Sequence, residues 1–387
     1  MDNHYYVRFQ TLILLLNLLF IFYYSLIKLL LAQIDLFEMK IIDLRSDTVT
    51  KPSPEMWQYV KSMGNSQLGD DVMGEDPTVN DLEDKAAKIV GKEAALLVTS
   101  GSQGNLVSLL SQTKPGDEIL LEELSHIFLN EVGSAARIGG LMIRTYPSAR
   151  GTPSFEYLQS LIRDKEEIHE PPSTLLCTEN THNYQGGAIV ELDALKKMRD
   201  FTLKNELKFN LDGARIFNAA VGLNVSVTEI TKYADSVMFC LSKGLSCPVG
   251  SIVAGSKEFI SKARRFRKML GGGMRQAGII AAFGLLALEP KWIKRLDEDH
   301  KNAKQLAQGL KNFNLPIKIH PTDTNIVIVE LLEKVRILKI ITALNKAGIL
   351  AFNISKEKIR FVTHYGINTD DIDYSIEQIG LILKKIL

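Results

Sequence analysis

A lysine stands at the end of an apolar run in the segment VMFCLSKGLSCPVGS, Val237 to Ser251. The run has the composition of a buried strand, and a turn rich in glycine and serine follows it. A lysine at such a position usually extends its ammonium group into water. The alternative is chemical, because a lysine in a partly desolvated pocket loses proton affinity and becomes an amine nucleophile toward a carbonyl carbon. The segment by itself leaves both interpretations open.

Four further polar positions follow other apolar segments in the same way. They are the turn Ser100-Gly101-Ser102, His126, His182 and Asp212. Each has an ordinary explanation alone, since glycine and serine begin many helices and an aspartate often forms a turn or caps a helix. Together with Lys243, they make five polar groups after five consecutive strand-like segments, which favours one shared site.

These five groups suit one kind of cofactor chemistry. The N–H groups of a glycine turn that opens a helix suit a phosphate. Asp212 suits a pyridine nitrogen that must stay protonated, a histidine stacks on a planar ring or moves a proton, and Lys243 bonds to a carbonyl carbon. The set therefore predicts a pyridoxal-phosphate site. A nicotinamide or nucleotide site is not indicated, because neither Gly-x-Gly-x-x-Gly after a first strand nor a Gly-Lys-Ser/Thr ending is present.

The elements around these residues alternate between strand-like and helical patterns from Ser53 onward. Strand-like runs lie within residues 92–101, 116–126, 141–147, 173–187, 207–220 and 236–244, and helical patterns cover 102–112, 154–168 and 191–205. This order predicts right-handed crossovers and a mostly parallel sheet covered on both faces, a three-layer α/β fold. Ligands of such sheets bind beyond the carboxyl ends of the strands, where the five polar groups stand.

From about Lys291 the pattern changes to a small α+β domain. Helices are predicted over residues 291–313, 336–349 and 371–387, with strands within 317–331 and 358–366. We expect a cofactor-binding large domain with an N-terminal arm over residues 39–290, and a small domain over 291–387 that brings Arg360 to the cleft. The remaining histidines are expected to be solvated or structural: His169, His300, His320 and His364.

Composition limits the class of protein. The chain has 387 residues, 45% of them apolar and 24% charged, which fits a globular protein of two domains. The net charge of +1 gives no field that favours nucleic acid. Cys177, Cys240 and Cys247 form neither a disulfide framework nor a zinc pattern, so we expect no metal site and a reducing compartment.

The first 38 residues form a hydrophobic extension. Phe9 to Ile27 contains no charged residue and is long enough to span a membrane, and the apolar run resumes after Lys28. The start MDNHYYVR lacks the basic character of a signal peptide. Two alternatives stay open: a membrane anchor through residues 9–32, or a working protein that begins at Met39 and is cytoplasmic.

Six motifs, in order, resemble those of a known family. They are DLRSDTVT (Asp43–Thr50), GDDVMGEDPTVNDLE (Gly69–Glu83), ENTHNYQGG (Glu179–Gly187), LDGARIFNA (Leu211–Ala219), LSKGLSCPVGS (Leu241–Ser251) and GGGMRQAG (Gly271–Gly278). The chain resembles the low-specificity L-threonine aldolases, which are pyridoxal-phosphate enzymes with the aspartate-aminotransferase type of fold. The likeness runs from about Ile41 to the end, and family members usually begin near Met39, which favours the second alternative for the extension.

The resemblance implies roles in cofactor binding. Lys243 would bond to the cofactor, Asp212 would pair with its pyridine nitrogen, and His126 would stack on its ring. The phosphate would be held by two residues of the same chain and approached by two of a neighbouring subunit: Gly101 and Ser102, then Arg275 and Lys268. At least a homodimer is therefore expected, and the resemblance suggests a homotetramer.

The resemblance also implies a substrate and a reaction. Ser46, Arg215 and Arg360 would bind the substrate carboxylate, which suits the planar fork of arginine. His182 is a candidate proton carrier, and Met73 stands where the family usually has tyrosine. The expected reaction is retro-aldol cleavage of L-threonine or L-allo-threonine to glycine and acetaldehyde, in glycine biosynthesis and threonine catabolism. The alternatives are a β-eliminating lyase or an aminotransferase on this scaffold, and a membrane-tethered binding protein with an inactive site.

Overall fold

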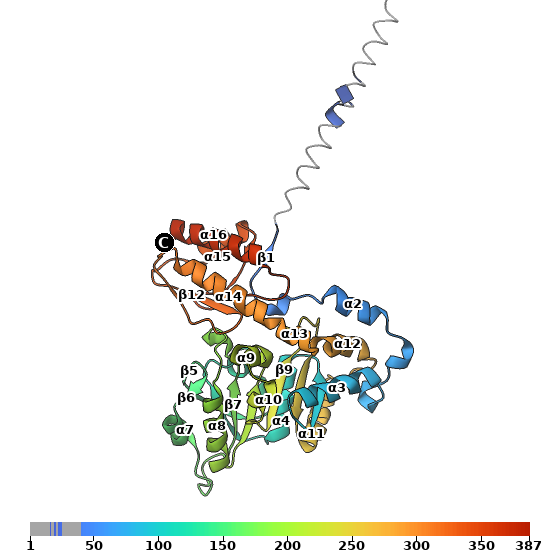
Figure 1. Ribbon diagram of the computed structural model, residues 1–387. Coiled ribbons are helices and arrows are strands. Elements are labelled where there is room, and N and C mark those ends of the chain that lie inside the picture. Colours follow the sequence, from blue (N-terminus) through green and yellow to red (C-terminus); the bar gives the residue numbers. More distant parts are fainter. Residues whose placement is uncertain (1–15, 17–18, 21, 25–39) are drawn as a thin grey trace, which may run out of the picture. The chain divides into compact units, whose positions relative to one another are not determined.

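The computed structural model describes Leu16, residues 19–20, 22–24 and 40–387, which are drawn in colour in Figure 1. The described positions between 16 and 24 are helical. Most of the N-terminal extension, including most of its apolar run, lies outside the described residues. In the part that is described, no helix is both long enough and apolar enough to cross a membrane. Both alternatives for the extension therefore stay predictions.

A seven-stranded sheet lies at the centre of Ile42–Leu387, which form one compact unit. The strands, in their order across the sheet, are β2 (Ala94–Val98), β10 (Ser251–Gly255), β9 (Ser236–Cys240), β8 (Lys208–Asp212), β7 (Ser173–Glu179), β3 (Glu118–Glu122) and β4 (Met142–Tyr146). The pairings from β9 to β4 are all parallel, and β10 runs antiparallel to β2 and β9. The predicted mostly parallel sheet is confirmed, and the sequence analysis missed β10.

Both faces of this sheet are buried under helices (Figure 1). Successive residues of β9 pack into different hydrophobic clusters, Phe239 with α3 (Pro77–Ile89), α8 (Leu192–Lys204) and α12 (Gly278–Ala287), and Met238 with α4 (Gly101–Gln112) and α11 (Lys257–Met269). Strands buried on both faces read as continuous apolar runs, which is the pattern that Val237–Cys240 shows. The predicted three-layer architecture is confirmed.

Other elements connect these layers. They are α2 (Pro54–Lys61), α5 (His126–Leu129), α6 (Ser134–Arg137), β5 (Ser148–Ala149), β6 (Thr152–Pro153), α7 (Phe155–Leu161), α9 (Ile216–Leu223), α10 (Val227–Thr231) and the 3-10 helices η1 (Asp47–Val49), η2 (Asn65–Gln67), η3 (Asp71–Met73) and η4 (Asn183–Gln185). A helix is expected over residues 154–168, but α7 ends at Leu161. The backbone adopts an extended conformation at Ile162 (φ −68°, ψ 128°), which ends the helix.

A second, antiparallel sheet forms near the C-terminus. Its order is β11 (Ile317–Ile319), β12 (Ile326–Leu331), β15 (Lys358–Val362) and β14 (Phe352–Asn353), and α14 (Leu296–Lys311), α15 (Ile337–Lys346) and α16 (Thr369–Ile386) accompany it. The helix expected over residues 291–313 is divided at Arg295 into α13 (Pro290–Lys294) and α14. The division at residue 290 stays a prediction.

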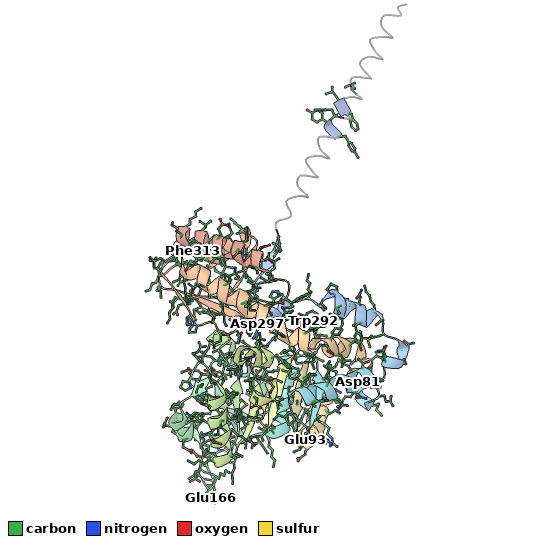
Figure 2. The ribbon with its side chains drawn as sticks, viewed as in Figure 1. Asp81, Glu93, Glu166, Trp292, Asp297 and Phe313 are labelled. Atoms are coloured by element: carbon green, nitrogen blue, oxygen red, sulfur yellow. The ribbon has the colours of Figure 1, made fainter. Side chains whose placement is uncertain are left out.

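The N-terminal arm joins the C-terminal part of the chain. Its strand β1 (Ile42–Asp43) pairs in parallel with β13 (Ile349–Leu350). Glu93 precedes β2 and Glu166 lies before β7, and Figure 2 shows both at one end of the unit. Trp292, on α13 at the start of the C-terminal part, lies away from that end. The carboxyl ends of the parallel strands therefore point toward the C-terminal part.

Candidate active site

The five predicted polar groups lie at or beyond the carboxyl ends of β2, β3, β7, β8 and β9. These strands run in one direction, so their carboxyl ends share one edge of the sheet. The charges of Asp212 and Lys243 both act on the pKa of His126, and Lys243 also acts on that of Asp47. The sheet thus brings residues from distant parts of the chain into one electrostatic site.

Lys243 follows β9 in a tight turn, here called the lysine turn (Leu241–Gly250). Backbone hydrogen bonds close it: Ser246 N donates to Lys243 O at 2.8 Å, and Leu241 N donates to Gly250 O at 3.1 Å. Ser246 has a φ of +65°, a left-handed conformation that L-residues rarely adopt. The turn holds Lys243 partly exposed at the sheet edge.

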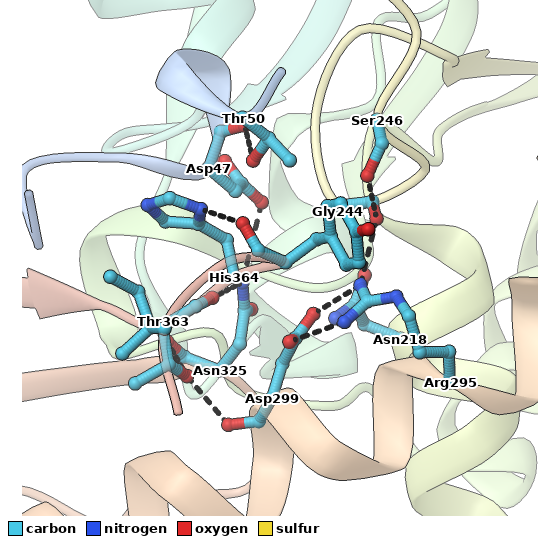
Figure 3. Close-up of polar contacts among 12 residues, drawn as sticks. Asp47, Thr50, Asn218, Gly244, Ser246, Arg295, Asp299, Asn325, Thr363 and His364 are labelled. Carbon is cyan, nitrogen blue, oxygen red and sulfur yellow. Dashed lines mark hydrogen bonds and ion pairs between the residues drawn. The ribbon is translucent and has the colours of Figure 1, made fainter. Parts of the chain in front are cut away.

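Arg295, at the break between α13 and α14, forms a hydrogen bond that holds the lysine turn (Figure 3). Its Nη2 donates to Gly244 O at 3.1 Å, and its two terminal nitrogens hold both carboxylate oxygens of Asp299 at 2.8 Å. The hydroxyl of Thr363 donates to the backbone oxygen of Asp299 at 2.5 Å. Because Thr363 follows β15, this network ties the lysine turn to the strand that carries Arg360.

We expect Gly244→Ala to lower the free energy of unfolding by about 1–3 kcal/mol, because a Cβ there would lie 2.9 Å from Leu296 Cδ2. Urea denaturation measures this change. The matched control is Gly64→Ala, since nothing lies within 4 Å of a Cβ at Gly64 and its φ is −110°. Equal midpoints for the two variants would show that the turn is not tightly packed against α14.

Asp212 ends β8 and is 2% exposed. Its Oδ1 accepts a hydrogen bond from Ala214 N at 3.1 Å, and its Oδ2 accepts one from Asn105 Nδ2 at 2.9 Å. Two donors therefore fix the orientation of the carboxylate. Each carboxylate oxygen retains a lone pair, so Asp212 can still accept a hydrogen bond from a protonated ring nitrogen.

His126 begins α5, and its Nδ1 lies 2.9 Å from Glu131 Oε1. Burial lowers the pKa of His126, but the hydrogen bond to Glu131 and the charges of Asp212 and Glu131 outweigh it, so the pKa is raised above 6.5. One ligating atom each of His126, Glu131 and Asp212 lies within 4.8 Å of the others. Hydrogen bonds from Asn105 to both carboxylates account for this close approach.

His182 differs from His126 in being fully buried, at 0% exposure. Its Nε2 lies 2.8 Å from Glu122 Oε2, and its Nδ1 has no hydrogen-bond partner among the described residues. Burial lowers the pKa of His182, and the hydrogen bond to Glu122 with nearby carboxylates raises it more. Any proton transfer by His182 would therefore use Nδ1, whereas the partly exposed ring of His126 offers Nε2.

The start of α4 offers an anion site. Ser100 caps the helix by accepting a hydrogen bond from Gln103 N at 3.2 Å, which leaves the N–H groups of Gly101 and Ser102 without intrahelical acceptors. A Cβ at Gly101 would lie 2.9 Å from Cys240 Sγ, so the helix start packs closely against the end of β9. The predicted location of Gly101 and Ser102 is therefore compatible with a phosphate.

Arg215 is engaged more fully than the sequence indicated. Its Nε and Nη2 each donate to one carboxylate oxygen of Asp47 at 2.7 Å, and both side chains are at most 5% exposed. Burial raises the pKa of Asp47, but the charge and hydrogen bonds of Arg215 outweigh it and hold that pKa well below its ordinary value of 3.8. Nε and Nη2 are thus occupied, and Nη1, whose one contact among the described residues is with Asn183 Oδ1 at 3.5 Å, has a second N–H for a substrate.

Arg360, on β15, lies close to Arg215. The Nη1 atoms of both arginines point at Asn183 Oδ1, at 2.9 Å from Arg360 and 3.5 Å from Arg215. Burial and the charge of Arg215 lower the pKa of Arg360 to about 10, and its buried Nε has no hydrogen-bond partner among the described residues. Two adjacent guanidinium groups, one of them with an unpaired Nε–H among the described residues, are suited to bind a carboxylate.

The remaining predicted residues lie around this region or apart from it. Ser46 is 6% exposed and accepts a hydrogen bond from Thr48 N at 3.2 Å, directly before Asp47. Arg275 is exposed and pairs with Asp70 at 2.7 Å, and Lys268 is exposed near the end of α11. Neither bonds to Gly101 or Ser102 in the described part of one chain, so their expected action on a neighbouring subunit stays a prediction.

Several residues that shape the site were not predicted from the sequence. They are Asp47, Asn105, Glu122, Glu131, Asn183 and Arg295. Asp47 and Asn183 lie inside the motifs DLRSDTVT and ENTHN, so their position beside Ser46 and His182 was an available signal. The others lie in helices, strand ends and connections without a local pattern that marks them.

Comparisons with known proteins identify the family of the chain. A family model described as "Beta-eliminating lyase" matches residues 43–334. Low-specificity L-threonine aldolase 1 of Arabidopsis thaliana is 40% identical over 344 residues, which cover 87% of this chain and 95% of that protein. The low specificity L-threonine aldolase of Escherichia coli strain K12 is 43% identical over 295 residues, which cover 76% and 86%.

A solved structure shares the fold. The Leishmania major threonine aldolase superposes with a TM-score of 0.77 at 16% identity, and the match covers 88% of this chain and 99% of that one. The sequence identities above reach over most of both proteins. The chain therefore belongs to the family of low-specificity L-threonine aldolases, within the beta-eliminating lyases.

Proposed function

We propose that this protein is a pyridoxal-phosphate-dependent aldolase that cleaves L-threonine and L-allo-threonine to glycine and acetaldehyde. The observation that carries the proposal is that Lys243, Asp212 and Arg215 converge at one edge of the parallel sheet, where Arg360 of the second sheet meets Arg215 at Asn183. An amine, a ring-nitrogen partner and a carboxylate site are the three things that an amino acid bound to this cofactor requires. The relatives named above support the choice of substrate.

The residues of the site fit the cofactor. The amine of Lys243, the carboxylate of Asp212 and the free N–H groups of Gly101 and Ser102 match its aldehyde carbon, ring nitrogen and phosphate. His126 would stack on the ring. When bound, pyridoxal phosphate supplies an electron-withdrawing ring that stabilises negative charge on the carbon next to the substrate amine.

The chain's own residues orient the substrate and move its protons. Arg360 offers Nε and Arg215 offers Nη1 to the carboxylate, which fixes the rotation of the substrate about its Cα. His126 holds Nδ1 against Glu131, so Nε2 is the ring nitrogen left to accept the β-hydroxyl proton. His182 is the second candidate, and its burial makes it the less accessible of the two.

A spectroscopic and product assay tests this function. We expect the purified protein, loaded with pyridoxal phosphate and freed of unbound cofactor, to absorb between about 300 and 500 nm, to change its spectrum when glycine is added, and to release acetaldehyde from L-threonine. A coupled dehydrogenase detects the aldehyde. Spectral change without aldehyde would move the reaction to β-elimination or transamination, which α-keto acid analysis then separates. No cofactor absorbance at all would contradict the proposed site.

We further propose that the protein works in the cytoplasm, in glycine biosynthesis and threonine catabolism, as a homodimer at minimum and as a homotetramer in full assembly. The family resemblance supports an assembly in which Lys268 and Arg275, both exposed in one chain, approach the phosphate site of another subunit. Light scattering after size-exclusion chromatography tests the assembly, and a monomer of full activity would contradict it. Fractionation of cells that express the full chain tests the membrane alternative.

A further inference from the structure

Glu131 is a buried carboxylate that contacts His126 and belongs to none of the cofactor-binding or substrate-binding groups. Its side chain is 1% exposed, and it lies between α5 and α6, in the connection that follows His126. Its Oε1 is 2.9 Å from His126 Nδ1 and accepts a hydrogen bond from Asn105 Nδ2 at 2.8 Å. Its Oε2 is buried and has no hydrogen-bond partner among the described residues. A carboxylate in this position is costly unless the pairing with His126 offsets its burial.

The contact restricts which tautomer His126 adopts. A carboxylate oxygen that already receives the Asn105 amide accepts hydrogen bonds only, so His126 Nδ1 must carry the proton. The neutral ring then presents Nε2 as an acceptor. A histidine oriented by a carboxylate at Nδ1 is the usual arrangement of a histidine that accepts a proton at Nε2.

Asn105 extends this contact to the ring-nitrogen partner. The same Nδ2 that donates to Glu131 also donates to Asp212 Oδ2 at 2.9 Å. Asn105 is on α4 and 1% exposed, so its amide is held by the packing of that helix. One amide therefore sets the distance between the two carboxylates, one of which faces the histidine and the other the cofactor site.

We propose that Glu131 is a positioning residue for His126. Glu131 holds the histidine in the Nδ1–H tautomer and, through Asn105, at a fixed position relative to Asp212. The role rests on the proposed function, because it concerns the proton that His126 accepts. Glu131 touches neither substrate nor cofactor in this role and acts through His126.

Every charged group near His126 must be considered in the test. Glu131 and Asp212 raise its pKa, burial and Lys243 lower it, and Glu179 accepts its backbone N–H at 2.7 Å. Glu131→Gln keeps one acceptor oxygen, removes the charge and replaces the second oxygen with an NH2 donor. We expect the pKa of His126 to fall by roughly one unit in this variant. We expect kcat to fall roughly 10- to 100-fold with little change in KM.

Nitrogen-15 NMR of the cofactor-loaded full chain with labelled histidine reads the tautomer and pKa directly, with the His126 signal assigned from His126→Gln. Glu122→Gln is the matched control, because Glu122 is equally buried beside the other histidine. Glu122→Gln should leave the pKa of His126 unchanged. Glu131→Asp, which keeps a carboxylate, should lower the pKa of His126 less than Glu131→Gln does.

Two results would overturn the positioning role. One is an Nε2–H tautomer for His126 in the unsubstituted protein, which is decisive even where the variants do not fold. The other is a Glu131→Gln variant in which His126 titrates as in the unsubstituted protein. The aldehyde assay is separate, since an unsubstituted protein that releases no acetaldehyde contradicts the proposed function and leaves the tautomer measurement valid.

Discussion

Lys243→Ala is expected to abolish covalent attachment of pyridoxal phosphate and to lower kcat by a factor on the order of 10⁴ or more. The lysine turn places this amine beyond the carboxyl end of β9, within the electrostatic range of His126 and Asp47. No other lysine of the motif LSKGLSCPVGS is available to replace it. Reduction with borohydride followed by mass spectrometry measures the attachment, and stopped-flow absorbance measures the turnover.

Lys262→Ala is the matched control for Lys243→Ala. Lys262 lies on α11, pairs with Glu258 at 2.9 Å and is 55% exposed, so its loss should leave both cofactor attachment and activity unchanged. A Lys243→Ala variant that still forms a reducible bond with the cofactor would remove Lys243 from the role proposed for it. A variant that binds the cofactor without covalent attachment and keeps full activity would contradict its part in catalysis.

Asp47→Ala is expected to lower the free energy of unfolding by about 3–5 kcal/mol, because it leaves the buried guanidinium of Arg215 without its partner. The pair is bidentate at 2.7 Å, and the side chain of Asp47 is fully buried. Chemical denaturation at neutral pH measures the change. Asp297→Ala is the control, since Asp297 pairs with Lys301 on the surface and should cost less than about 1 kcal/mol.

The Asp47–Arg215 pair also gives a dependence of stability on pH. The folded pKa of Asp47 is depressed, so its contribution is present above its ordinary pKa of 3.8 and is lost as the pH falls below that value. The unsubstituted protein should therefore lose more stability between about pH 5 and pH 3 than Asp47→Asn does. Parallel pH profiles for the two proteins would show that Asp47 is not charged against Arg215.

Loss of the Asp47–Arg215 pair should also raise KM for the amino acid. Without Asp47, the guanidinium of Arg215 can rotate away from Asn183, where the substrate carboxylate is expected to bind.

The sequence by itself determined the layers of the fold and the residues at the sheet edge. Alternating apolar strands and amphipathic helices predict a parallel sheet, because the period of each pattern is local to its element. Asp212 ends such a strand, Lys243 and Gly101 stand three residues after others, and the direction of a parallel sheet then places them together. The family motifs added the roles of Arg215 and Arg360.

Only the tertiary structure decided how these residues are held. Hydrogen bonds join Asp47 to Arg215, Glu131 to Asn105, and Arg295 to the lysine turn. Each joins residues far apart in the sequence, which the periodicity of a single helix or strand does not predict. The antiparallel strand β10 and the break at Arg295 depend likewise on what the surrounding chain packs against. A hydrogen bond between distant segments is fixed by the packing of whole elements, whereas a strand or helix is fixed by the order of its own side chains. The residues at the sheet edge could therefore be predicted from the sequence, and the contacts of Glu131 and Arg295 that orient them could not.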